Sequence, residues 1–153
     1  REEAELRDET IKLGISQVSS GSCTGVGGYS EREKDTKEKP QFELGDDRSP
    51  LEMIESLMKG GYVPSYCTAC YRNGRTGDRF MEIAKSGQIN VMCEANALMT
   101  LKEFLIDYAN DRLREIGDRV IMETLSKMPD ENFKNKIKEN LKAIENGVRD
   151  INV

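Results

Sequence analysis

Apolar side chains recur at three- and four-residue spacing through the second half of the chain, which is the pattern of amphipathic helices. From this spacing we predict helices over about 50–59, 78–85, 101–116, 118–128 and 130–146. The spacing is lost between Gly61 and Arg79 and again between Ser86 and Thr100, so we expect longer irregular segments there. The second half is therefore predicted to be mostly α-helical.

Two capping boxes indicate where helices begin. Residues 49–52, Ser-Pro-Leu-Glu, combine an N-cap hydroxyl, a proline at the first helical position and a glutamate at the third. Residues 100–103, Thr-Leu-Lys-Glu, repeat the hydroxyl and the glutamate, so we expect a second helix to begin there. Gly117 is expected to break that helix, because glycine is a poor helix former.

The first 30 residues show a different order of elements. A charged helix with a weak apolar stripe is predicted over 2–13, and Gly14 is expected to end it. A strand-like run follows over 15–20, and a glycine-rich loop over 21–29 comes next. A helix that leads through a glycine into a strand is an αβ connection. We therefore predict an α/β fold, with the chain beginning inside a larger α/β domain.

A charged segment separates this region from the helices. Residues 30–39 contain no apolar side chain and cannot contribute to a core. We therefore predict three parts: a first domain over 1–30, a charged linker over 31–45, and a helical domain over 46–153.

Composition narrows the function classes. The net charge is -5, so the chain lacks the excess of Lys and Arg that binds nucleic acid. No apolar run approaches the roughly 18 to 20 residues that span a bilayer, and the first residues do not resemble a signal peptide. We expect a cytoplasmic protein that binds neither nucleic acid nor membrane. The chain has no histidine, which excludes imidazole bases and Cys2His2 zinc sites.

Three of the four cysteines lie in the two segments predicted to be irregular. Cys67 and Cys70 form a C-x2-C pair, and Cys93 follows after 22 residues. Three thiolates can hold a 4Fe-4S cluster and leave one iron open to another ligand. The spacing alone leaves other interpretations open: a redox-active pair, a structural zinc with Cys23 or a carboxylate as fourth ligand, or three unrelated buried thiols.

Two further groups of side chains are candidates for ligand contacts. Arg72, Arg75 and Arg79 follow the cysteine pair closely and suit an anionic cluster with an anionic ligand. The alternative is an exposed charged turn. Ser22 and Thr24 flank Cys23 in the glycine-rich loop, where α/β folds place ligand contacts, and Ser20 ends the strand-like run before it. A tight turn with a spare thiol explains Cys23 equally well.

The assembled motifs resemble a known family. Matches lie at 15–17, 27–29, 47–49, 67–72, 74–77, 80–81, Cys93, 96–103 and 107–109. With these residues and the C-x2-C-x22-C pattern, the chain is similar to the C-terminal part of the radical S-adenosylmethionine (SAM) tyrosine lyases of FeFe-hydrogenase maturation.

The resemblance implies a fold, a reaction and a set of cofactors. It implies that residues 1–30 are the last helix and strand of a TIM-type barrel, and that Cys67, Cys70 and Cys93 hold an auxiliary 4Fe-4S cluster. It implies a parent lyase that uses SAM and a second 4Fe-4S cluster to convert tyrosine into p-cresol, CO and cyanide. The product would be an iron-carbonyl-cyanide unit for the hydrogenase H-cluster, with other hydrogenase maturation proteins as partners.

The chain departs from the family in two places. The SAM-cleaving signature C-x3-C-x2-C is absent, so we expect this chain to be part of a longer protein and inactive alone. Cys23 stands where the family has an arginine, so substrate binding there is in doubt. The competing hypothesis is a non-catalytic helical module that is stabilised by zinc and binds a protein partner.

Overall fold

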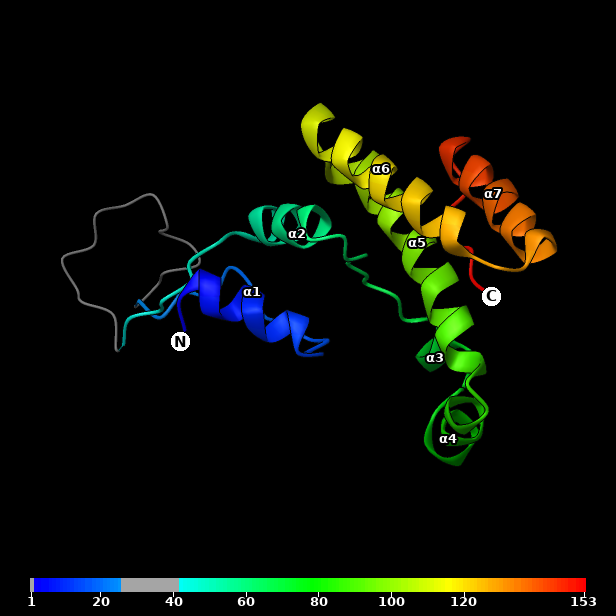
Figure 1. Ribbon diagram of the computed structural model, residues 1–153, viewed down its shortest axis with the longest axis horizontal. Helices are drawn as coiled ribbons and strands as arrows, with labels where there is room; N and C mark the ends of the chain where they lie inside the picture. Colours follow the sequence, from blue (N-terminus) through cyan, green and yellow to red (C-terminus); the bar gives the residue numbers. More distant parts are fainter. Residues whose placement is uncertain (1, 26–41) are drawn as a thin grey trace. The chain divides into compact units, whose positions relative to one another are not determined.

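A computed structural model describes residues 2–25 and 42–153. Every regular element in these residues is an α-helix (Figure 1). The helices are α1 (Ala4–Lys12), α2 (Pro50–Lys59), α3 (Ala69–Arg72), α4 (Gly77–Lys85), α5 (Gln88–Tyr108), α6 (Asp111–Lys127) and α7 (Glu131–Glu145). None of these helices is both long enough and apolar enough to cross a membrane.

The chain forms two compact units. Unit 1 is Arg1–Ser56 and unit 2 is Leu57–Val153, so the boundary falls inside α2. Most of the linker predicted over 31–45 lies outside the described residues, and its residues 42–45 have no regular structure. The predicted domains over 1–30 and 46–153 remain predictions.

The predicted α/β fold is wrong for the described chain, because the run over 15–20 is irregular rather than a strand. A strand needs a neighbouring strand to accept and donate its backbone hydrogen bonds, and the described residues contain none. The backbone bonds around this run go elsewhere: Ile15 N donates to Thr10 O at 3.4 Å, and Gly21 N donates to Arg48 O at 2.9 Å. The last strand of a TIM-type barrel is therefore not present in the described part.

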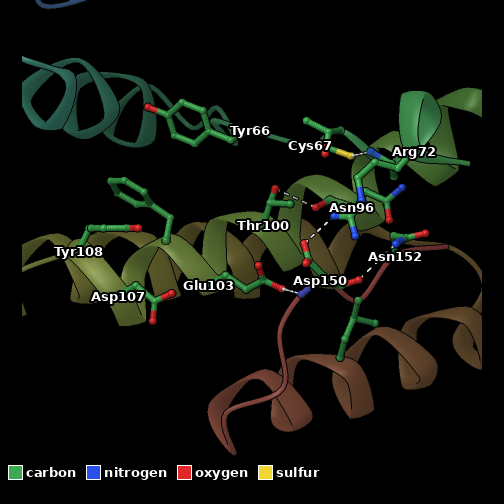
Figure 2. A pocket seen from close by; sticks show the side chains of 14 residues that line it. Tyr66, Cys67, Arg72, Asn96, Thr100, Glu103, Asp107, Tyr108, Asp150 and Asn152 are labelled. Atoms are coloured by element: carbon green, nitrogen blue, oxygen red, sulfur yellow. Dashed lines mark hydrogen bonds and ion pairs between the residues drawn. The ribbon is translucent and has the colours of Figure 1, made fainter.

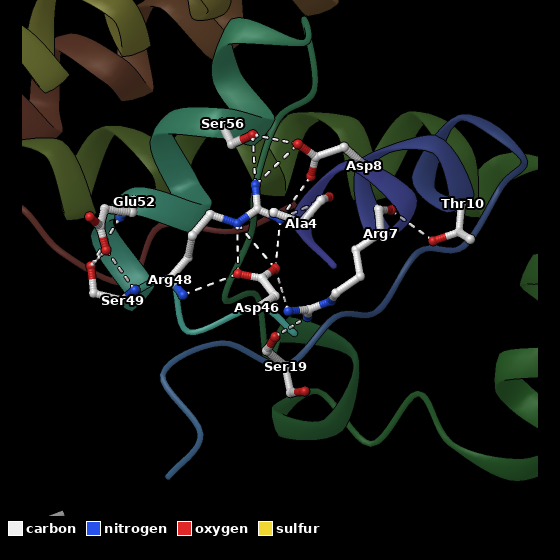
Figure 3. A network of polar contacts seen from close by, with 10 residues as sticks. All are labelled: Ala4, Arg7, Asp8, Thr10, Ser19, Asp46, Arg48, Ser49, Glu52 and Ser56. Carbon is white, nitrogen blue, oxygen red and sulfur yellow. Dashed lines mark hydrogen bonds and ion pairs between the residues drawn. The ribbon is translucent and has the colours of Figure 1, made fainter. Parts of the chain in front are cut away.

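Unit 1 is organised around a cluster of charges that joins α1 to the residues before α2 (Figure 3). Arg48 Nε donates to Asp46 Oδ1 at 2.9 Å, and its Nη2 donates to Asp8 Oδ1 at 2.9 Å. Arg7 Nη1 approaches Asp46 Oδ2 at 2.6 Å, and Ser56 Oγ lies 3.1 Å from Asp8 Oδ2. The side chain of Asp46 is only 1% exposed. The hydrogen bonds from Arg48 lower the pKa of Asp46 to about 2, because they stabilise the ionised carboxylate.

Unit 2 is built on α5. Both α6 and α7 pack against this long helix, and α4 packs against it as well (Figure 1). The apolar stripes of the three long helices meet in a core. Its most buried large side chains include Leu98, Met99, Leu105, Leu125, Ile137 and Ile144. The predicted helix over 130–146 is confirmed by α7, whereas the one predicted over 118–128 is only the later part of α6, which already begins at Asp111.

The second predicted capping box is wrong. Thr100 lies in the middle of α5, where its hydroxyl donates to Asn96 O at 3.0 Å instead of capping a helix start. The segment before it, predicted irregular, forms the first three turns of the same helix. The helix instead ends at Tyr108, and Asn110 caps the next one by accepting from Leu113 N at 2.9 Å.

Gly117 does not break its helix, contrary to the sequence prediction. It lies within α6 and is buried against α5. A Cβ atom at this position would lie 2.4 Å from Leu105 Cδ1, far inside van der Waals contact. The glycine therefore allows the two helices to approach closely, which is a tertiary requirement and not a local stop signal.

The first capping box is confirmed. Ser49 N donates to Glu52 Oε2 at 2.8 Å, and Glu52 N donates to Ser49 Oγ at 3.3 Å, so each side chain satisfies a free N–H group at the start of α2. The predicted end of α1 is also confirmed, because Gly14 adopts φ 101° directly after the helix.

Candidate functional site

The cysteine-bearing part of unit 2 is a turn that leads from an extended segment into two short helices. Cys67 precedes α3, Cys70 lies within α3, and Cys93 lies on the second turn of α5. Arg75 N donates to Cys70 O at 2.8 Å and closes the turn after α3. Gly74 has φ 62°, a conformation that favours glycine, and this lets the chain reverse toward α4. Cys70 and Cys93, 23 positions apart in the sequence, are thereby brought to one end of α5.

The three cysteines lie close enough to influence one another. Partial burial raises the pKa of the Cys93 thiol, and negative charge on Cys70 and Cys67 raises it further. The guanidinium of Arg75 acts in the opposite direction and lowers the same pKa. Cys67 and Cys93 are exposed and Cys70 is half-buried, and none of the three forms a disulfide. Three thiols and one cation therefore share a neighbourhood.

The thiols are not arranged as ligands of a single metal ion. Among the described residues, no group of three or more His, Cys, Asp or Glu side chains is close enough to hold one. A zinc ion with sulfur ligands at about 2.3 Å requires the sulfur atoms to lie within about 4 Å of each other. A 4Fe-4S cluster binds each thiolate at a different iron and keeps the sulfur atoms further apart.

A backbone amide donates a hydrogen bond to one of the sulfur atoms. Ala69 N donates to Cys67 Sγ at 3.4 Å, and Cys67 N donates to Ser65 Oγ at 3.1 Å. Hydrogen bonds to cysteine sulfur favour the thiolate and help to set the potential of iron-sulfur centres. The local backbone at Cys67 is therefore suited to a charged sulfur ligand.

The three candidate arginines have different partners and different degrees of burial. Arg72 Nη1 pairs with Asp150 Oδ1 at 2.7 Å, and this hydrogen bond raises the pKa of Arg72. Arg79 is exposed on α4. Arg75 is partly buried, and its Nη2 donates to Val153 O at 3.0 Å. Its Nε atom is buried, and no hydrogen-bond acceptor in the described chain reaches it.

The buried Nε–H group of Arg75, which has no acceptor in the described chain, favours a bound anionic group at this position. A buried guanidinium nitrogen without an acceptor costs roughly 1–3 kcal/mol, and more where the group is charged. An anionic group bound at the neighbouring thiols would supply negative charge beside Arg75. The residues present therefore fit a negatively charged iron-sulfur cluster.

The remaining residues predicted to contact a ligand lie in unit 1. Ser20, Ser22, Cys23 and Thr24 are all half-buried. The Thr24 hydroxyl donates to Phe42 O at 2.7 Å, so its hydrogen is used within unit 1. The three hydroxyl residues stay predictions as ligand contacts.

A pocket of about 460 Å³ opens beside Cys67 in unit 2 (Figure 2). One wall is aromatic: Phe104 lies with its ring centroid 5.9 Å from that of Tyr66 and 5.5 Å from that of Tyr108. Glu103 and Asp150 also line the pocket, and the backbone N of Asp150 donates to Glu103 Oε1 at 2.8 Å.

The residues that the sequence prediction missed lie in the segment 150–153. This segment contacts both the turn after α3 and the side of α5, at separations of 47 to 79 positions in the sequence. Its short Asp-Ile-Asn-Val run has no motif that points to such a role. Asn96, its buried partner on α5, lies within one of the stretches that match the family, and this was the one signal available.

One solved structure is similar to this chain over its whole length. No protein-family model matches the chain, and no curated protein matches it. A crystal structure of HydG, a maturase of the FeFe-hydrogenase, superimposes with a TM-score of 0.88 at 53% sequence identity. The match covers 100% of this chain and 32% of that protein. The resemblance found in the cysteine-bearing motifs is thus confirmed: this chain is related over its whole length to HydG and spans about a third of it.

Proposed function

We propose that this chain is the auxiliary iron-sulfur region of an FeFe-hydrogenase maturase, with Cys67, Cys70 and Cys93 as ligands of a 4Fe-4S cluster. The observation that carries the proposal is the 53% identity to HydG over the full chain, within which Cys93 interacts with Cys67, Cys70 and the partly buried Arg75. Three thiolates leave one iron of such a cluster open to a further ligand.

The chain's own residues supply the surroundings of the cluster. Ala69 N donates to the Cys67 sulfur, and Arg75 supplies positive charge beside Cys93. Arg72 at the end of α3 and Arg79 on α4 contribute charge at more exposed positions. Because Arg75 has a buried N–H group without an acceptor in the described residues, it is the strongest of the three candidates for charge compensation.

The parent protein would be a radical SAM tyrosine lyase. It would use SAM and a second 4Fe-4S cluster, bound outside this chain, to convert tyrosine into p-cresol, CO and cyanide. The iron-carbonyl-cyanide unit would be its product, delivered to other hydrogenase maturation proteins in the cytoplasm. This chain lacks C-x3-C-x2-C, so by itself it would not cleave tyrosine. Ser20, Ser22 and Thr24 stay candidates for substrate contacts.

Anaerobic reconstitution with iron and sulfide tests the proposal. We expect about four irons and four sulfides per chain, with an absorption band and an EPR signal typical of a reduced 4Fe-4S cluster. Cys67→Ala should lose most of the bound iron, because one of three ligands is removed. Cys23→Ala is the matched control and should retain it, because Cys23 lies outside the C-x2-C-x22-C pattern.

The zinc-stabilised module is the alternative that the same measurement detects. Stoichiometric zinc without sulfide in the purified chain would contradict the cluster. Equal amounts of bound iron in the reconstituted wild type and in Cys67→Ala would also contradict the cluster. In the zinc case, a chelator should unfold unit 2, because structural zinc contributes directly to folding.

A further inference from the structure

The segment 150–153 connects two parts of unit 2 that both carry cysteines. On one side it contacts the turn after α3: Asp150 pairs with Arg72 at 2.7 Å, and Asn152 Oδ1 accepts from Asn73 Nδ2 at 2.9 Å. Cys70 lies within that short helix, two residues before Arg72. The segment therefore holds Arg72 and Asn73, which closely follow Cys70 in the sequence.

On the other side the same four residues contact α5. Val153 N donates to Asn96 Oδ1 at 2.9 Å, and Asn96 Nδ2 donates back to Val153 O at 3.4 Å. Asn96 is 2% exposed and lies three residues after Cys93, close to one helical turn away. The backbone N of Asp150 adds a bond to Glu103, two turns further along α5. Figure 2 shows the segment lying along this helix.

Val153 O has a second donor. Besides Asn96, it accepts from Arg75 Nη2 at 3.0 Å, while Arg75 Nη1 lies 3.9 Å from the sulfur of Met92. Met92 is the residue directly before Cys93. One backbone oxygen thus holds the guanidinium of Arg75 and ties it to Asn96 on α5.

The backbone of the segment is set for this arrangement at some cost. Asp150 has φ 62°, and it is the one non-glycine residue of the described chain in the left-handed region. Aspartate tolerates this conformation better than most residues, but surrounding contacts must hold it there. Its side chain and its backbone N–H group both have partners, on the turn and on α5 respectively.

We propose that the segment 150–153 is a positioning element for the three cysteines. It holds the turn with Cys67 and Cys70 against the α5 residue Cys93, and through Val153 O it makes Arg75 a positioning residue beside them. Its role toward a cluster rests on the function proposed above. The spacing of the thiols is a property of the metal-free chain and can be measured without any cluster.

The first measurement therefore uses the metal-free chain. A bifunctional thiol reagent such as dibromobimane bridges two cysteines only when they are close, and mass spectrometry identifies the bridged pair. We expect bridges from Cys93 to Cys70 or Cys67 in the wild type. The double variant Asp150→Ala with Asn152→Ala should lower their yield at least threefold, while bridging within the pair Cys67 and Cys70 stays unchanged.

The second measurement uses the reconstituted chain and Arg75→Gln. We expect iron to be lost to a chelator about tenfold faster than in the wild type, and the cluster to be about tenfold harder to reduce, which is about 59 mV for one electron. Arg75→Lys should restore the potential more than the resistance to chelator, because it keeps the charge but not the forked contacts. Arg119→Gln, an exposed residue of α6, is the matched control and should change neither.

The outcomes separate the two proposals. If the wild type binds no iron-sulfur cluster but the double variant still loses its bridges, the cluster proposal fails and the positioning role stands. If the wild type binds a cluster while neither the bridging yield nor the potential nor the rate of iron loss changes in the variants, the positioning role is overturned. Should the double variant prove unfolded by circular dichroism, Asn152→Ala alone, which removes one exposed contact, replaces it under the same criteria.

Discussion

In unit 1 the buried charged side chain of Asp46 is held by two guanidinium groups, whereas the interior of unit 2 is mainly apolar, with Leu98 and Ile137 fully buried. The two units therefore respond to different changes. A buried charge depends on its partners and on pH, because its desolvation is offset only while the opposite charges remain. Apolar packing depends on volume and is nearly indifferent to pH.

The largest effect should come from a cavity in unit 2. Leu98 is fully buried on α5, so Leu98→Ala should lower the free energy of unfolding of unit 2 by about 4 kcal/mol. Val91→Ala on the same helix is the control: Val91 is 51% exposed, and its loss should change stability by less than about 0.5 kcal/mol. Urea denaturation measures both. Equal effects of the two substitutions would show that α5 is not the centre of an apolar core.

A smaller effect is expected from breaking the charge cluster of unit 1. Arg48→Met leaves Asp46 buried with Arg7 as its remaining ion-pair partner, and we expect a loss of about 3 kcal/mol in the protection of unit 1. Lys12→Met removes an exposed ion pair with Glu9 and serves as the control, with a change of about 0.5 kcal/mol or less. Hydrogen exchange of the α1 amides reports on both. A stable Arg48→Met variant would mean that apolar contacts, not charges, hold unit 1.

The smallest effect on stability is expected from lowering the pH, and it should destabilise unit 1 but not unit 2. The pKa of Asp46 is about 2 in the folded chain and 3.8 without its partners, so this carboxylate stabilises the fold above pH 3.8. That contribution, up to about 2 kcal/mol, is lost as pH falls from about 5 toward 2. Amides of α1 should therefore lose protection in this range before those of α6. Parallel loss in both helices would contradict the comparison.

Much of the helical architecture follows from local signals. The capping box of Ser49 and Glu52 and the N-cap of Asp130 satisfy N–H groups within a few residues, so sequence spacing is enough to find them. The same reasoning failed at Thr100 and Gly117. A threonine in mid-helix can bond to the preceding turn, and a glycine can serve a helix contact, and only the packing of α5 against α6 shows which applies.

The candidate site was predictable in its chemistry more than in its architecture. The spacing of Cys67, Cys70 and Cys93 indicated a thiolate site, and the absence of histidine limited the possible ligands. Spacing did not distinguish Arg75 from Arg72 and Arg79. Their different roles depend on Val153 and Asp150, which lie 78 positions further along the chain.

The sequence by itself determined closely where α1, α2, α4 and α7 begin and end, which residues carry thiols, and which family the chain resembles, because these features depend on neighbours within a few positions or on residue identity. Tertiary structure decided that residues 15–20 form no strand, that Asp46 is held ionised, and that segment 150–153 joins the cysteine turn to α5. Each of these depends on hydrogen bonds or packing between residues far apart in the sequence, and no local pattern encodes which distant group will be the partner.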